Sequence, residues 1–280
     1  MRNNTKQKYV ILFTLSIFLL FACKEVDLTD PISTNPEVPP IASMQIDFSS
    51  FPENSNLAKI TGNNSINNIE TQDNWAWAWI HGVGWKTLVS VGMSIPFAAF
   101  VESFNHEAVQ QEDGRWLWEY SFSSHDSINH TASLYASIDI SGIDWEMYIS
   151  KETFFDNFMW FSGRSDLFGK NGTWTFFSEP KNPEPWLGIE WEYNKADSTG
   201  SIKYTDIYEK SDGKGGYINY GLVADSTYDA FFDIYDAKKD NLISIKWNRE
   251  THEGRIKDFK HFSDNEWHCW NSNLENIECN

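Results

Sequence analysis

Apolar and polar side chains alternate along a series of short segments between residues 114 and 262. The clearest segment is residues 115–122, in which every second side chain is aromatic. These aromatic residues are Trp116, Trp118, Tyr120 and Phe122. The side chains between them include Glu119 and Ser121, so one face is apolar and the other polar. A period of two is typical of a β-strand that buries one face.

Similar segments recur as far as residue 260, separated by turns rich in Gly, Asn and Asp, which are typical of β-hairpins. They cover residues 131–140, 144–149, 158–164, 172–177, 187–193, 201–208, 217–223, 227–235, 241–248 and 254–260. About ten strands at this spacing predict an antiparallel meander in a mainly β protein.

A long meander tends to curl or close, because closure removes its exposed edges. We therefore expect a closed, soluble barrel, with a two-sheet sandwich or jelly roll as the alternative. A membrane-spanning barrel needs strands of about 9–11 residues, and several segments here are shorter.

One helix is predicted before the strands, at about residues 71–91. Asp73 or Asn74 can cap its first turn, and Trp75, Trp79 and Val83 recur near helical spacing. The segment is apolar on most sides, so we expect it to pack on or in the barrel rather than lie in solvent.

The composition supports a large aromatic core and excludes one class of partner. Aromatic residues make up 16% of the 280 residues, and the net charge is −18. Aromatic side chains favour strands. A chain this acidic cannot neutralise a phosphate backbone, so a nucleic acid is not expected as partner.

The first 23 residues have the order of an export signal. The basic residues Arg2, Lys6 and Lys8 precede an apolar run over residues 9–22. A membrane-spanning helix needs about 20 apolar residues, so this run is shorter than such a helix. The run ends in Leu20-Phe21-Ala22-Cys23, which resembles the lipobox of bacterial lipoproteins. The resemblance implies cleavage before Cys23 and acylation of its thiol, palmitate included, in the cell envelope. A simple N-terminal membrane anchor with an incidental cysteine is the alternative.

Three regions follow from this interpretation. Residues 1–22 are the expected lipoprotein signal peptide, and residues 23–43 an acidic, proline-containing flexible tether. Residues 44–280 form a single β-rich domain. Its Trp-x-Trp-x-Tyr pattern resembles small β-barrel lipoproteins of Gram-negative envelopes, which implies a barrel tethered by lipid, with the outer membrane as the expected location.

Two cysteines remain once Cys23 is acylated. Cys269 and Cys279 form an even pair in an oxidising compartment, which predicts a disulfide near the C-terminus. Two free thiols are the alternative.

Candidate chemistry is sparse. Glu190 and Glu192 project from the same face of one predicted strand, as the paired carboxylates of a glycan hydrolase do. The third acidic position of that pattern is Asn194 here, so a solvated polar face is the simpler interpretation. Trp116, Trp118 and Tyr120 are candidates for ligand binding, or else core residues. No histidine or acidic cluster has the spacing of a metal site, and no cofactor is expected.

The sequence therefore favours a lipid-anchored envelope lipoprotein that is a non-catalytic binding or structural module. Its expected ligand is apolar or a glycan. The alternative is a glycan-acting hydrolase that uses Glu190 and Glu192.

Overall fold

A computed structural model describes residues 35–45, 51, 73–123 and 128–279, apart from the side chains of residues 85–90. The signal peptide, Cys23 and most of the predicted tether lie outside the described residues. Within them, no helix is long and apolar enough to cross a membrane.

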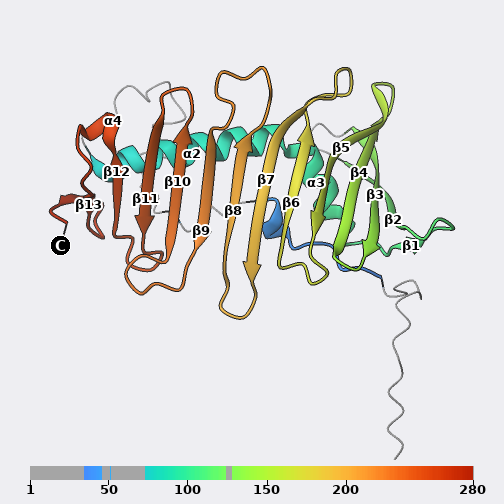
Figure 1. Cartoon of the computed structure of the whole chain (residues 1–280), viewed down its shortest axis with the longest axis horizontal. Helices are drawn as coiled ribbons and strands as arrows, with labels where there is room; N and C mark the ends of the chain where they lie inside the picture. Colours follow the sequence, from blue (N-terminus) through green and yellow to red (C-terminus); the bar gives the residue numbers. More distant parts are fainter. Residues whose placement is uncertain (1–34, 46–50, 52–72, 124–127, 280) are drawn as a thin grey trace, which may run out of the picture. The chain divides into compact units, whose positions relative to one another are not determined.

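The architecture is one antiparallel sheet of 14 strands whose spatial order equals their order in the chain (Figure 1). The predicted meander is therefore confirmed. The strands are β1 (Val109–Gln110), β2 (Trp116–Ser123), β3 (Asn129–Asp139), β4 (Gly142–Lys151), β5 (Phe155–Ser165), β6 (Asn171–Phe177), β7 (Pro185–Asn194), β8 (Thr199–Asp206), β9 (Tyr217–Leu222), β10 (Ala230–Asp236), β11 (Asn241–Trp247), β12 (Gly254–Asp258), β13 (His268–Trp270) and β14 (Asn276–Ile277).

The expected closed barrel is wrong: in the described part of the chain, the sheet is open and β1 does not pair with β14. Each of these edge strands is only two residues long. Short edge strands offer few unpaired backbone groups to another chain. The open sheet therefore avoids edge-to-edge association without closing into a barrel.

Helices, rather than a second part of the sheet, bury the aromatic face. The predicted helix is α2 (Asn74–Gly92), and α3 (Ser94–Ser103) follows it. We call the face that they cover the inner face and the opposite face the outer face. Figure 1 shows both helices crossing behind the strands.

The two helices cross the strands in reverse order. The Asn74 amide at the start of α2 donates to the Cys269 carbonyl in β13 (2.8 Å). Gly92, at its end, adjoins Trp186 of β7. The Phe100 ring of α3 contacts Trp174 of β6 at a centroid distance of 5.9 Å. One helical pair thus covers strands far apart in the sheet and gives a single-layer meander a continuous core.

That core combines the inward-facing side chains of β2 to β13 with buried side chains of α2 and α3. Its largest fully buried members are Trp145, Trp174, Trp247, Trp270, Tyr204 and Phe161. Buried indole nitrogens require acceptors, because an unpaired polar group in the core is costly. Trp145 Nε1 donates to Ser165 Oγ at 2.9 Å, for example.

The last part of the predicted tether belongs to the fold. Pro36 and Pro39 are buried, and the short 3₁₀ helix η1 (Ile41–Ser43) contacts β7. Trp174 Nε1 donates to the Ser43 carbonyl (3.1 Å) and the Tyr204 hydroxyl to the Met44 carbonyl (2.8 Å). The chain therefore joins the domain several residues before the predicted boundary at residue 43.

The predicted disulfide is present. Cys269 in β13 and Cys279, just after β14, are bonded with their Cα atoms 5.3 Å apart. The bond ties the last strand to its neighbour at one edge of the sheet.

Candidate functional site

The aromatic residues singled out as ligand candidates lie at the inner face. Trp118 and Tyr120 are buried beneath the helices, and Trp116 is half-buried at the same face. The Tyr120 hydroxyl donates to the Ala99 carbonyl of α3 at 2.5 Å. These side chains fasten α3 to the sheet, so their packing corresponds to the core alternative.

The two carboxylates singled out for catalysis lie exposed on the outer face. Glu190 faces Lys203 across the β7–β8 pair, and Glu192 faces Ser201, whose hydroxyl donates to it at 3.2 Å. Neither lines the cavities described below. The hydrolase alternative stays a prediction without support from a cleft.

A large open cavity lies beside α3, and its volume is about 710 Å³. Its walls combine the residue Met44 after η1, the α2–α3 junction, α3 and the end of β2. The apolar lining consists of Met44, Met93, Phe97, Ala98, Val101 and Phe122. The polar rim consists of Gln45, Ser94, Glu102, Ser121, Ser123 and Asn129.

Helical spacing explains why α3 can serve both the core and this cavity. Pro96, Ala99, Phe100 and Ser103 follow the i, i+3, i+4, i+7 pattern and are buried. The residues at 94, 97, 98 and 101 follow the same pattern on a second face, which borders the cavity. Phe97, Ala98 and Val101 remain only half-buried there although all three are apolar.

Glu102, the only carboxylate among the described residues that line this cavity, is already engaged. Glu102 Oε1 lies 3.1 Å from His106 Nε2, and Glu102 Oε2 accepts from Asn105 at 3.2 Å. The His106 ring stacks on Tyr120, whose pKa is raised by burial. None of the described residues that line the cavity is a cation. The site is thus an apolar trough with a neutral to weakly acidic rim.

A second cavity, of about 460 Å³, lies where α2 meets β12 and the short helix α4 (Phe259–Phe262). Buried Asp258 accepts from Trp77 Nε1 (2.9 Å) and Asn241 Nδ2 (2.8 Å). It also caps α4 through backbone N–H groups. Its carboxylate is therefore occupied by structural hydrogen bonds.

Histidine chemistry in this second cavity is limited by burial. The Trp77 ring stacks on His261 at 4.0 Å and meets His81 edge-on at 4.7 Å. The pKa of His81 is lowered by burial, which outweighs the attraction of Asp258. Its Nε2 is buried and has no hydrogen-bond partner among the described residues. A neutral His81 can accept a hydrogen bond. The carboxylates of Asp206, Asp236 and Asp258 also line this cavity, but Asp258 is held by structural hydrogen bonds and Asp236 pairs with Lys239.

Metal chemistry finds no support in the described part of the chain, where no three His, Cys, Asp or Glu side chains gather around a common point. No family model matches this chain, and neither does any curated protein or solved structure. The site must therefore be interpreted from its own geometry.

The α3 cavity could not be predicted from the sequence, because the pattern of residues 97–104 is compatible with either a helix or a strand. A signal was present nonetheless. The ten-residue helix has two separate apolar stripes, and a single sheet can cover only one of them. The second stripe indicates a further contact or a cavity.

Proposed function

We propose that this protein is a lipid-anchored envelope lipoprotein, acylated at Cys23, that binds an apolar ligand in the cavity beside α3 without transforming it. The lipobox-like residues 20–23 support the anchor, and the outer membrane of a Gram-negative bacterium is the proposed location. Two or three acyl chains give stable attachment, whereas one chain alone binds only marginally.

The second apolar stripe of α3 is the observation that carries the binding proposal. Phe97, Ala98 and Val101 are set at helical spacing, yet they face a cavity rather than the sheet. Apolar surface that stays exposed to water lacks a burial free energy of about 25 cal/mol per Å². A ligand that covers these side chains recovers this free energy.

The size and rim of the cavity narrow the ligand class. A volume of about 710 Å³ lies within the roughly 300–1,000 Å³ that small-molecule sites occupy. The carboxylate of Glu102 and the hydroxyls of Ser121 and Ser123 can bind a ligand whose polar end is neutral or cationic. We therefore favour an apolar molecule or acyl chain with an uncharged head over a fatty acid anion or a glycan.

A fluorescent probe can test the cavity directly. Residues 34–280 form one compact unit, so a chain starting at Thr34 retains all described contacts. We expect N-phenylnaphthylamine to gain fluorescence on binding this form. Monoacylglycerol should displace the probe more effectively than the corresponding fatty acid, and neutral oligosaccharides should not displace it.

The matched variants are Ala98→Phe and Ala196→Phe. The first fills the cavity with a ring, and the second adds the same ring at an exposed turn between β7 and β8. Only Ala98→Phe should lose probe binding. Both variants should melt cooperatively, which verifies that the fold is retained. Equal binding by the two variants would exclude this cavity as the site.

The anchor is tested separately. Intact mass of the native protein should show cleavage before Cys23 and added acyl mass, and Cys23→Ala should move the protein out of the membrane fraction. An unmodified N-terminal segment that is still present would contradict the lipoprotein proposal and leave the cavity proposal untouched.

A further inference from the structure

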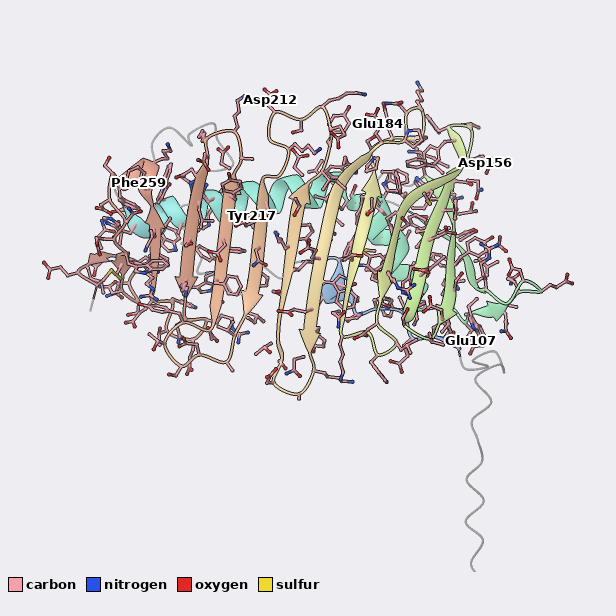
Figure 2. All side chains as sticks on the ribbon, viewed as in Figure 1. Glu107, Asp156, Glu184, Asp212, Tyr217 and Phe259 are labelled. Atoms are coloured by element: carbon pink, nitrogen blue, oxygen red, sulfur yellow. A yellow bond between two sulfur atoms is a disulfide. The ribbon has the colours of Figure 1, made fainter. Side chains whose placement is uncertain are left out.

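The outer face of the sheet divides into an acidic half and a basic half, although the chain as a whole carries −18. The strands β2 to β7 project the carboxylates of Glu119, Asp144, Glu146, Glu190 and Glu192, and Arg164 of β5 pairs with Asp144 among them. The strands β8 to β12 project the cations Lys203, Lys246, Arg255 and Lys257, together with the one carboxylate of Asp233 among the described residues of these strands' outer face. Tyr217, labelled in Figure 2, lies on the basic half.

Three of these cations lie next to one another. Lys246 of β11 is directly opposite Arg255 of β12, and Lys257 is two residues further along β12 on the same face. Like charges at such positions repel, so this arrangement costs stability unless something offsets it.

Aromatic rings hold the cluster in place. The guanidinium carbon of Arg255 lies 4.3 Å from the ring centroid of Trp267 and 4.5 Å from that of Tyr228. The Nζ atoms of Lys257 and Lys246 lie 5.1 and 5.9 Å from the same Trp267 ring. Cation–π contact partly offsets the repulsion and fixes the Arg255 side chain between two rings.

Nearby carboxylates do not pair directly with the cluster. Asp229 pairs with Arg249 (2.8 Å), and Asp233 accepts from the Ser244 hydroxyl (2.7 Å). Asp225 attracts Lys246 and Arg255 electrostatically, while its oxygens accept backbone N–H groups in its own turn. Across the described residues, neither Lys246, Arg255 nor Lys257 forms an ion pair, and the Arg255 Nε–H has no acceptor.

We propose that this basic cluster, formed by Lys246, Arg255, Lys257 and Trp267, binds a discrete ligand with two or three closely spaced phosphate or carboxylate groups. The charges are held in place by aromatic rings and form no direct ion pair, a condition that favours binding of an anion. Phosphorylated saccharides and uronic-acid oligomers both carry groups of this kind.

An anionic membrane surface fits the same face less well. A bilayer would meet the acidic half as well as the basic half, and it would repel Glu190 and Glu192. A discrete ligand can occupy the basic cluster alone.

Titration of the full-length protein in an uncharged detergent tests the proposal, with tripolyphosphate and hexagalacturonate as separate probes. We expect saturable binding of at least one probe, weakened as salt is raised. Tighter binding of tripolyphosphate would identify phosphate as the preferred group, and tighter binding of hexagalacturonate the sugar carboxylates.

The double variant Lys246→Gln/Lys257→Gln should lose affinity by about tenfold or more. The control Lys181→Gln/Lys195→Gln removes the same charge from exposed turn positions and should bind as the wild type does. Thermal melting of both variants verifies that the fold is retained.

Three results would overturn the proposal. The first is no binding of either probe by the wild type, and the second is an equal loss of affinity in the two double variants. The third is a response only when part of the detergent is replaced by phosphatidylglycerol, which would assign the cluster to a membrane surface.

Discussion

The indole of Trp270 in β13 lies against the backbone of Gly254 in β12, in the space that a side chain would occupy. A Cβ atom added at Gly254 would lie 2.1 Å from Trp270 Cζ2 and 2.7 Å from the Lys246 carbonyl oxygen. Both neighbours are fixed, because Trp270 is buried and its Nε1 donates to the His252 carbonyl at 2.9 Å. The glycine is therefore a packing requirement of the core.

Gly254→Ala should consequently destabilise the protein by about 1–3 kcal/mol, the usual cost of overpacking a core. Urea unfolding followed by tryptophan fluorescence measures this change. Gly84→Ala is the matched control, since nothing lies within 4 Å of its added Cβ in α2. That variant should be neutral or up to about 1 kcal/mol more stable, because alanine favours the helix. Equal effects at the two positions would refute the packing argument.

Tyr120→Phe should weaken the attachment of α3 to β2 and lower the free energy of unfolding. It removes a buried hydrogen bond from the Tyr120 hydroxyl to the Ala99 carbonyl, at a cost of about 0.5–1.5 kcal/mol. Hydrogen exchange should accelerate at α3 more than at α2. Ligand-probe binding beside α3 should also weaken. A variant with unchanged stability would show that water replaces the hydroxyl.

Alkaline pH provides a second test of Tyr120. Burial raises the pKa of this phenol in the folded protein, so the unfolded chain ionises first. The free energy of unfolding should therefore fall as pH rises above about 10, the pKa of an unperturbed tyrosine. Comparing stability–pH curves of the wild type and Tyr120→Phe isolates this contribution, which should vanish in the variant.

His81 should make stability depend on mildly acidic pH. Its pKa is lowered in the folded state by burial, so the unfolded chain binds the proton more readily. The free energy of unfolding should then decrease as pH falls below about 6.5. His81→Leu should flatten the curve between about pH 5 and 7, whereas His252→Asn, at an exposed turn, should not. Two identical slopes would mean that another group titrates in this range.

Reduction of the Cys269–Cys279 disulfide should loosen the β13–β14 edge first. The bond spans ten residues, for which the loss of loop closure corresponds to about 2–3 kcal/mol. The Asn74 side chain also bonds to the Cys269 carbonyl, so the start of α2 should lose protection from hydrogen exchange. Melting with and without dithiothreitol measures the shift, and a Cys269→Ser/Cys279→Ser variant should show none.

The alternation of side chains was sufficient to predict β2 to β12 and their antiparallel order. Most of these strands bury every second residue over several positions, as β2, β4 and β11 do, so local periodicity carries the information. The burial pattern of β5 is irregular, because register shifts interrupt its pairing with β4. The remaining strands, β1, β13 and β14, have only two or three residues. Runs of that length contain no period, and only their neighbours make them strands. The capping residues and apolar spacing near residues 71–91 also predicted the helix α2. The even number of cysteines left after Cys23 predicted the disulfide.

Tertiary structure alone decided what covers the aromatic face. Periodicity shows that Trp118, Trp174 and Trp247 lie on a buried face, but the same pattern suits a closed barrel, a sandwich or a sheet under helices. The choice depends on contacts such as Phe100 with Trp174, which join residues distant in the chain. The cavity beside α3 and the basic cluster on β11 and β12 arise in the same way. Each depends on which strands become neighbours, and therefore on the register of the whole sheet.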